Sequence, residues 1–292
     1  MRCAGCVVLS SWVLLAPVGS RAGAEELRIE IEGYGFGVRD LRVEPNILVF
    51  VSRPSEAPPP VPPDPFELEG LGVRIHGAVD LPGRRGRFET SYQKVQDSDA
   101  FAKSVSLIRY SGTARTTLSA LDLGWSGVLA QQERWNLRGQ VGYRYLNADQ
   151  EINTVTLLHE SIPSSSRFDL DSDIDGHGLR AGTELSVALG GPLQVLAGSG
   201  FALLRAAETG RQVSSFEFEP GQVQLNEEAI DEDSLSLSTW DLSVRLRAEL
   251  WDRVSASIGY RFDRWESAAR IFSDADLAFD GVTFGLGYRF GI

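Results

Sequence analysis

The chain has 292 residues, and its 28 Lys and Arg against 40 Asp and Glu give a formal net charge of −12. An acidic chain of this kind fits the polyanionic backbone of DNA or RNA poorly, so we expect no nucleic-acid partner. Beyond residue 24 no apolar run reaches the roughly 18 residues of a membrane-spanning helix, which excludes a helical membrane protein but leaves a membrane barrel open.

The first 24 residues have the order of a secretory signal. Arg2 precedes a mostly apolar stretch at 7–18 that is too short to cross a bilayer, and the small residues Ala22-Gly23-Ala24 then match the pattern that signal peptidase reads. We expect cleavage before Glu25. Both cysteines lie inside this signal, so the sequence predicts no disulfide and no cysteine-bound metal in the mature chain.

Residues 25–65 form an N-terminal segment ahead of the main pattern. Leu27, Ile29 and Ile31 alternate with polar residues, 47–51 is apolar, and 53–65 is rich in proline. One interpretation is a first strand within 27–51, followed by an extracellular loop of polyproline geometry. The alternative is a periplasmic segment and linker outside the main fold.

From residue 66 onward, apolar and polar residues repeatedly alternate with period two, which is typical of a β-strand with one apolar face. The clearest segment is 282–292, where every even position is apolar. A segment at 88–95 is weaker, and 193–204 is apolar or small on both faces, so its facing stays open. The other alternating segments are 71–80, 121–129, 135–145, 179–189, 240–250 and 254–262.

The connections between these segments differ in length. Those at 131–134, 190–192 and 251–253 are short, whereas 147–176, 206–234 and 263–281 are long and carry 20 acids against four arginines. Outer-membrane barrels have short periplasmic turns and long extracellular loops, and they carry Trp and Tyr near the strand ends. A soluble β-sandwich would also alternate but would not need this loop pattern. The sequence therefore predicts an all-β, antiparallel, transmembrane up-and-down β-barrel over 66–292, in a bacterial outer membrane.

The number of strands depends on the N-terminal segment. Nine strands are expected between residue 66 and Phe290, and bacterial single-chain barrels have even strand numbers. We therefore expect ten strands, with the tenth in 27–51. Eight strands are the alternative, in which about the first 60 mature residues lie outside the barrel.

Charged residues occupy the polar faces of these strands, where a barrel turns them into its lumen. Because eight are cationic and five anionic, we expect a slightly positive interior that favours anions. The alternative is a plug of ion pairs, since about eight strands leave room only for side chains. The predicted lumen charges are Arg74, Arg138, Arg144, Arg180, Arg245, Arg247, Arg261, Arg289, Asp80, Asp122, Glu184, Asp241 and Glu249.

The acidic loop expected at 147–176 contains a partial metal-binding pattern. Asp171, Asp173 and Asp175 precede Gly176, as in the first half of a calcium loop, but the last ligand position is Gly182 instead of a glutamate. We expect a weak metal site or, alternatively, an acidic loop that ends in a glycine turn. Divalent cations on such loops would bridge to phosphates, so outer-membrane lipid and lipopolysaccharide are the expected partners.

Histidines supply the candidates for catalysis. The histidines are His76, His159 and His177, and of these His177 with Asp173 or Asp175 could act as a general base in a lipid or peptide hydrolase. No G-x-S-x-G frame or similar nucleophile motif accompanies it, so we expect no enzyme and no catalytic residue.

The chain ends inside its last predicted strand. Tyr288, Phe290 and Ile292 share the outward face there. This aromatic ending predicts a recognition signal for the barrel-assembly machinery, which we expect as a further partner.

Three stretches resemble the Legionella-type major (pore-forming) outer-membrane protein family. They are 121–145 (LDLGWSGVLAQQERWNLRGQVGYRY), 175–204 (DGHGLRAGTELSVALGGPLQVLAGSGFALL) and 277–290 (LAFDGVTFGLGYRF). The resemblance spans about 116–290 and implies a pore-forming or structural surface protein without a cofactor. The chain departs from the family by placing Gly291-Ile292 after the terminal Phe290.

Together these patterns predict a narrow pore or a structural envelope protein. The alternative function is a surface adhesin or ligand-binding barrel that acts through its acidic loops. A lipid or peptide hydrolase of the outer membrane is a third class.

Overall fold

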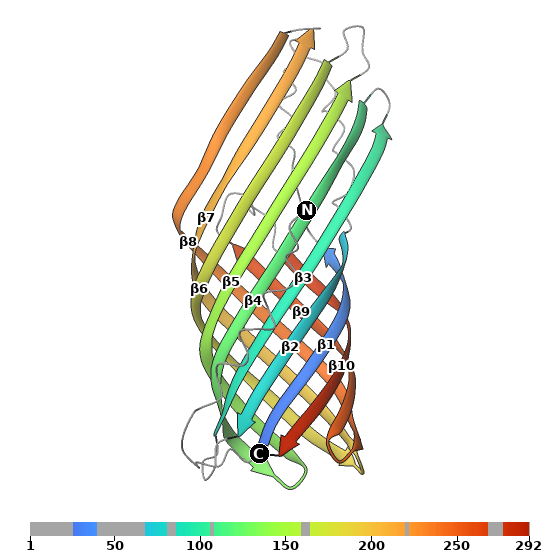
Figure 1. Ribbon diagram of the computed structural model, residues 1–292, viewed down its shortest axis with the longest axis vertical. Coiled ribbons are helices and arrows are strands. Elements are labelled where there is room, and N and C mark those ends of the chain that lie inside the picture. Colours follow the sequence, from blue (N-terminus) through green and yellow to red (C-terminus); the bar gives the residue numbers. More distant parts are fainter. Residues whose placement is uncertain are drawn as a thin grey trace, which may run out of the picture.

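The computed structural model describes residues 26–39, 68–80, 86–105, 108–158, 164–219, 222–267 and 277–291. These residues form ten antiparallel strands that close into a ring (Figure 1). The predicted barrel and its ten strands are confirmed, and the eight-stranded alternative is wrong. The strands are β1 (Glu26–Arg39), β2 (Leu68–Asp80), β3 (Gly86–Val105), β4 (Ile108–Gln132), β5 (Trp135–Leu158), β6 (Ser164–Gly190), β7 (Leu193–Glu219), β8 (Gln222–Trp251), β9 (Val254–Ser267) and β10 (Leu277–Gly291).

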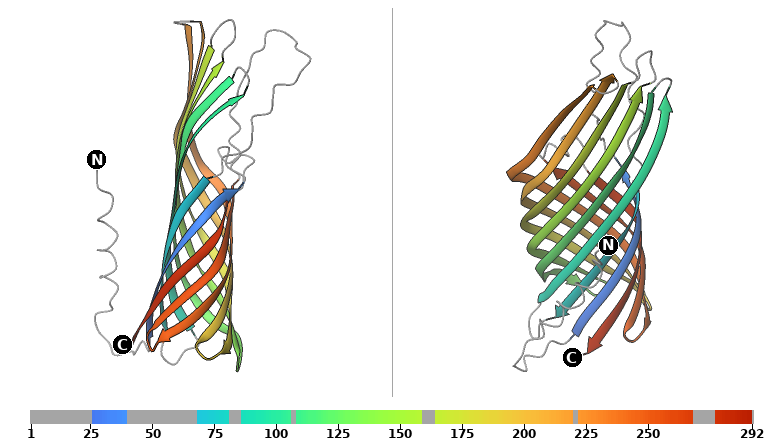
Figure 2. Two further views of the ribbon diagram at one scale, coloured as in Figure 1. Left: turned by 90° about the vertical axis from the view of Figure 1, so that its right-hand side faces the viewer. Right: turned by 45° about the horizontal axis from the view of Figure 1, so that its top comes forward.

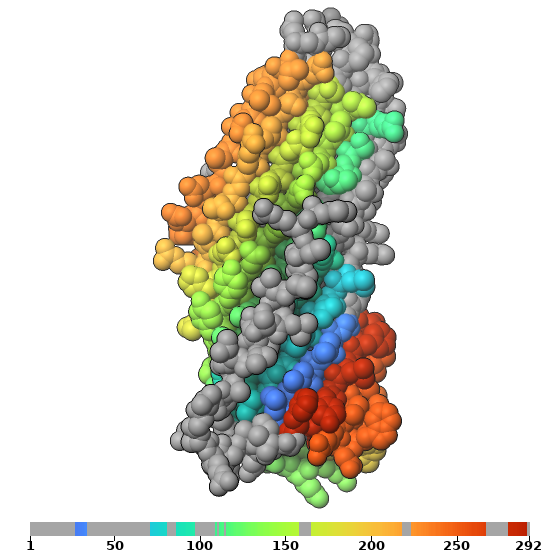
Figure 3. Space-filling model, viewed as in Figure 1, coloured from blue at the N-terminus to red at the C-terminus, as the bar shows by residue number. Residues whose placement is uncertain are grey.

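Strand β1 comes from the N-terminal segment and closes the barrel. Glu26 lies opposite Gly291 of β10 on one side and Asp80 of β2 on the other. Figure 3 shows β1 and β10 side by side on the barrel wall, as adjacent blue and red surfaces. The predicted signal at 1–24, the apolar 47–51 and the proline-rich 53–65 lie outside the described residues.

The outer face of the barrel is a belt of exposed apolar side chains, because each strand turns every second residue outward. Val244 on β8 is 56% exposed and Leu286 on β10 is 64% exposed. A closed ring of exposed aliphatic and aromatic side chains is the surface that lipid surrounds in outer-membrane barrels. The apolar belt includes Ile29, Ile31, Leu71, Val73, Phe88, Leu123, Trp125, Leu129, Val141, Tyr143, Tyr145, Leu179, Leu203, Trp240, Leu242, Val244, Leu246, Ile258, Tyr260, Val282, Phe284, Leu286, Tyr288 and Phe290.

The alternating segments face as the sequence predicts, and the structure settles the open one. In β7, Leu203 is 61% exposed on the outer face, whereas Leu204 is buried inside. Short turns join the strands at one end of the barrel, at 133–134, 191–192 and 252–253. At the turn between β6 and β7, Gly190 and Gly191 adopt positive φ angles of 112° and 58°, which residues with a Cβ rarely adopt.

Strands β3 to β8 continue beyond the belt at the opposite end and form what we call the projecting sheet (Figures 1 and 2). Pairing persists there, for example Asp149 with Asp173 and Gly210 with Ile230. The prediction of long loops at 147–176 and 206–234 is therefore wrong, since both stretches are mainly strand. The third expected loop is 263–281. Its first residues belong to β9 and its last residues to β10, and 268–276 lies outside the described residues.

An apolar cluster fills the lumen where the belt meets the projecting sheet. Its members come from seven strands, β3 to β9, and all face inward. We call this cluster the apolar cap: Val95, Leu118, Leu146, Ala148, Ile174, Ala202, Leu204, Ala206, Leu235, Leu237 and Trp265. None of the described residues forms a helix with the length and apolar character needed to cross a membrane.

Candidate functional site

The barrel interior gathers the charged residues that the sequence singles out. Because inward and outward residues alternate along every strand, the register that turns the apolar belt outward turns these charges inward. The structure places all thirteen predicted lumen charges on the inner face. They do not stand apart as the lining of an open channel, because most of them contact an opposite charge.

Six further inward charges were missed by the sequence analysis. Glu30 and Glu32 alternate with Ile29 and Ile31, so the same period-two reading, applied to the N-terminal segment, would have found them. With these six, ten cations face nine anions, and the expected surplus of three positive charges (eight against five) falls to one. Among the described residues the lumen charges therefore come close to balance, and the slight positive surplus that the sequence predicts is smaller than expected. The added residues are Arg28, Glu30, Glu32, Arg87, Glu89 and Asp263.

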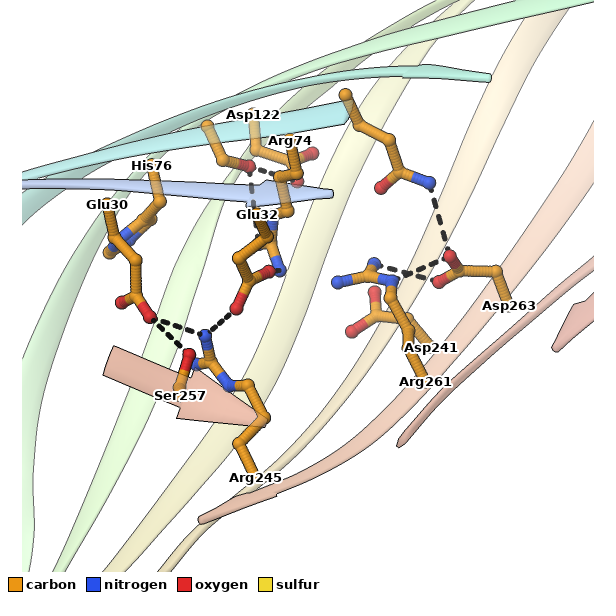
Figure 4. Close-up of polar contacts among 12 residues, drawn as sticks. Glu30, Glu32, Arg74, His76, Asp122, Asp241, Arg245, Ser257, Arg261 and Asp263 are labelled. Carbon is orange, nitrogen blue, oxygen red and sulfur yellow. Dashed lines mark hydrogen bonds and ion pairs between the residues drawn. The ribbon is translucent and has the colours of Figure 1, made fainter. Parts of the chain in front are cut away.

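One group of contacts joins β8 to β1 and β2. The Arg245 guanidinium contacts both Glu32 and Glu30, with 3.3 Å between its Nη1 and Glu30 Oε1. Ser257 on β9 donates a hydrogen bond of 3.3 Å to the same Glu30 oxygen. Figure 4 shows Glu30, Glu32 and Arg245 pointing toward one another inside the barrel. Arg74 on β2 lies 4.0 Å from Glu32, which extends the group around the wall.

A second group spans β4, β5, β6 and β8. Arg144 binds Asp122 through two hydrogen bonds of 2.6 and 2.9 Å, and it also reaches Asp241 at 3.4 Å. Arg180 binds Asp241 through bonds of 2.8 and 3.0 Å. The residue of β7 beside this ion pair is Gly200, which has no side chain. A Cβ at this position would lie 2.5 Å from both Arg180 Nη2 and Asp241 Oδ1. Gly200 therefore leaves the space that the ion pair fills.

A third group crosses the lumen. On β9, Arg261 donates hydrogen bonds of 2.6 and 2.8 Å to Asp263. Gln93 on β3 donates another, 3.1 Å long, to the same carboxylate from a distant part of the wall. All three side chains are buried. Side chains therefore meet across the barrel at this level.

The charged groups leave a cavity between them. A cavity of about 70 Å³ lies between residues such as His76, Glu89, Gln140 and Glu184. A water molecule needs about 10–15 Å³ of such space, so the cavity has room for several. His76 lies 3.8 Å from Glu89 here, inside the barrel wall.

The apolar cap lies directly beyond the charged groups. In three strands an apolar residue follows a charged or polar lumen residue by two positions toward the projecting sheet. The pairs are Gln93 and Val95, Arg144 and Leu146, and Asp263 and Trp265. The lumen is thus filled in two layers, ion pairs first and apolar side chains above them.

The predicted metal site does not form. Asp171, Asp173 and Asp175 lie along strand β6 on its exposed face, and alternate strand residues are about 7 Å apart, whereas a calcium loop wraps its ligands around one point. No metal-binding group of three acids, histidines or cysteines occurs within the described ranges. Asn147 instead donates hydrogen bonds to Asp173 and Asp175, and burial together with the charge of Asp175 raises the pKa of Asp173.

The histidines do not assemble a catalytic pair. His177 lies on the outer face of β6 and stacks on Tyr143, with 6.2 Å between ring centroids. Within the described residues no hydrogen bond or ion pair joins it to Asp173 or Asp175, and Tyr145 donates to Asp175 instead. His159 lies outside the described residues.

The predicted assembly signal is on the outer face. Tyr288 and Phe290 contact each other edge to face, with 4.5 Å between ring centroids, at the turn end of β10. Both belong to the apolar belt. Ile292 lies outside the described residues.

Several solved structures are similar to this chain. The outer-membrane protease OmpT of Escherichia coli aligns over 91% of this chain and 97% of its own, with a TM-score of 0.49 and 8% identity. Ail of Yersinia pestis, in complex with a heparin analogue, aligns over 91% and 98%, with a TM-score of 0.30 and 13% identity. The Pseudomonas putida toluene transporter TodX aligns over 94% and 91%, with a TM-score of 0.32 and 6% identity.

These likenesses concern the fold, and at such identities no activity is carried over from them. No protein-family model and no curated protein matches the chain. The resemblance to the Legionella-type family stays a prediction. The closed ring of strands and its apolar belt identify the chain as an outer-membrane β-barrel.

Proposed function

We propose that this protein is a non-conducting outer-membrane barrel that holds a β-sheet outside the membrane as a recognition surface. The observation that carries the proposal is the filled lumen, which polar side chains cross from wall to wall. Gln93 and Asp263 meet there, and Arg245 reaches Glu30 and Glu32. The apolar cap then covers these contacts on the side of the projecting sheet.

A filled lumen favours one of the expected functions over another. Ions cross a pore through water or through groups that replace their hydration shell, and apolar constrictions exclude them. Most of the lumen charges here already contact an opposite charge, and all members of the apolar cap except Trp265 have purely hydrocarbon side chains. The geometry therefore supports the structural barrel more than the narrow anion pore.

The projecting sheet supports a role in recognition. Beyond Tyr145 of the apolar belt, β5 continues to Leu158, a distance of about 40 Å along the strand. A barrel needs only its belt to stay in the membrane, whereas ordering each further residue costs about 1–2 kcal/mol of backbone entropy. The hypothesis of an adhesin or ligand-binding barrel places recognition on acidic loops. The structure supports this hypothesis in a changed form, with the projecting sheet as the recognition surface.

Electrical recording tests the proposal. Protein refolded in detergent and inserted into a planar bilayer is expected to produce no current steps. Discrete steps from the unmodified protein would contradict a non-conducting barrel.

A further inference from the structure

The projecting sheet leaves one side of β8 without a neighbour among the described residues. Strand β8 pairs with β7 from Gln222 onward, but it pairs with β9 only from Leu237, which lies opposite Ser267. Residues 222–236 therefore have a strand on one side only, within the part of the chain that the structure describes. Such an edge presents a row of backbone N–H and C=O groups that another strand can pair with.

This edge is accessible and held in place. Every side chain from 223 to 229 is exposed, and Val223 and Leu225 are 61% and 62% exposed. Ile230 turns to the inner face and packs against Ile152 and Leu170, which are buried. The edge is thus anchored by its inner face, while its outer face and free side are open.

The edge also carries negative charge that its surroundings do not balance. Residues 222–236 contain five acids and no Lys or Arg. Of these acids, Glu227 pairs with Arg211 of β7 at 2.7 Å, and the other four have no ion-pair partner in the described residues. The buried Glu208 carboxyl has a raised pKa, chiefly through burial and also through the charge of Glu232. The five acids are Glu227, Glu228, Asp231, Glu232 and Asp233.

We propose that the 222–236 edge of β8 binds an extended basic peptide segment of a partner protein, which adds to the sheet as a further strand. This inference rests on the proposed recognition function and names the surface and the chemistry of its ligand. Backbone hydrogen bonds along the edge supply pairing, and Lys or Arg on both faces of the peptide meet the acids, of which Glu227 and Asp231 share the outer face of β8 and Glu228 and Glu232 the inner face. A second copy fits this edge poorly, because its own β8 edge is equally acidic and like charges repel.

The probe for this edge is a short synthetic peptide of Lys-Lys-Val-Val repeats, which carries Lys on both faces of a strand, with a fluorescent label. Binding to the full-length protein in detergent micelles is followed by fluorescence anisotropy. We expect binding that weakens as salt is added, since exposed charges are screened. The same peptide with N-methyl groups on every amide keeps its charge but loses its donors, so it is expected not to bind. Equal binding of the two peptides would overturn the proposal.

Variants locate the binding on the edge. The edge variant Glu228→Gln/Asp231→Asn/Asp233→Asn removes three charges from β8. The control Asp149→Asn/Asp171→Asn/Asp173→Asn removes three charges from the wall of the same sheet. We expect affinity to fall about tenfold in the edge variant, from three exposed ion pairs, and by less than about twofold in the control. Equal losses would show a diffuse attraction to the whole sheet and overturn the proposal.

Hydrogen exchange distinguishes the other possible occupants of the edge. In the free protein, the amides of 222–236 that face away from β7 are expected to exchange quickly, and the Lys-Val peptide is expected to protect them. Protection without peptide in a monomer would mean that the chain covers its own edge, and protection that depends on dimerisation would mean that a second copy does. Either result overturns the proposal. Channel activity would defeat the proposed non-conducting barrel but would leave these binding results unchanged, so the two failures are distinguishable.

Discussion

Gln93 on β3 donates a hydrogen bond of 3.1 Å to Asp263 on β9, although β10, β1 and β2 separate the two strands in the ring. Both side chains are buried. Because the two side chains meet inside the lumen, no open channel runs between these two parts of the wall at this level. It also ties the wall together, because the Asp263 carboxylate accepts hydrogen bonds from Arg261 at the same time.

The ion pairs of the lumen are expected to stabilise the barrel as sets. Replacing Asp241 by Leu removes both hydrogen bonds between Arg180 and a carboxylate and leaves only Asp122, 3.7 Å from its Nε, so we expect the free energy of unfolding to fall by about 3–5 kcal/mol. The double variant Asp241→Leu/Arg180→Met removes both charges, and Arg144 keeps its two bonds to Asp122. Most of the loss is therefore expected to be recovered. Urea unfolding in detergent measures both, and a double variant as unstable as the single one would contradict the pairing.

The apolar belt predicts that introducing a charged side chain destabilises the barrel by an amount that depends on its position along the strand. Val244→Arg places a cation in the lipid near mid-bilayer and is expected to destabilise the barrel by about 2–4 kcal/mol. Ser236 lies on the same strand and the same outer face, but beyond the belt, so Ser236→Arg is expected to cost less than about 0.5 kcal/mol. Unfolding of both variants in lipid vesicles measures the difference. Equal costs would place the membrane boundary elsewhere.

The buried carboxyl of Glu208 predicts a dependence of stability on pH. Burial raises its pKa in the folded protein, and the charge of Glu232 adds to the rise, while a hydrogen bond from Ser172 opposes it. The folded state therefore holds this proton more tightly than the unfolded state. Its stability is greatest below the ordinary carboxyl pKa and falls as the pH rises from that value through the raised one.

Glu208→Gln removes this titration and keeps a similar shape. We expect the variant to be more stable than the parent at pH 7, and the difference to vanish at low pH, where the parent carboxyl is protonated. Thermal unfolding at several pH values provides the measurement. A constant difference at all pH values would show that Glu208 does not titrate in the way its burial requires.

Period-two alternation made much of the barrel predictable from sequence. Each clear segment turns to lipid the face that the sequence predicts, as Val244 and Leu286 show. The same rule predicts inward charges such as Arg144 and Asp241. What it cannot predict is which charges meet, because Arg245 and Glu32 are 213 positions apart and come together only when the ring closes.

The projecting sheet was not predictable in the same way. Its outer face is rich in charge, with Asp149 opposite Asp173 and Glu151 opposite Asp171, and like charges in opposing positions disfavour a strand pair. The buried inner residues outweigh this cost, since Ile152 and Ile174 lie almost fully inside. Acid content alone therefore suggested loops where alternate apolar residues form strands.

The most direct test of the account is the conductance of single inserted molecules in a planar bilayer. A control variant removes the second group of lumen ion pairs, two acids and two arginines, and thins the apolar cap, so that the current it passes also verifies insertion. We expect current steps from the control and none from the unmodified protein. Regular steps from the unmodified protein would contradict the filled lumen, and anion-selective steps would restore the narrow pore. The control carries Asp122→Ala, Arg144→Ala, Arg180→Ala, Asp241→Ala, Leu146→Ala and Leu204→Ala.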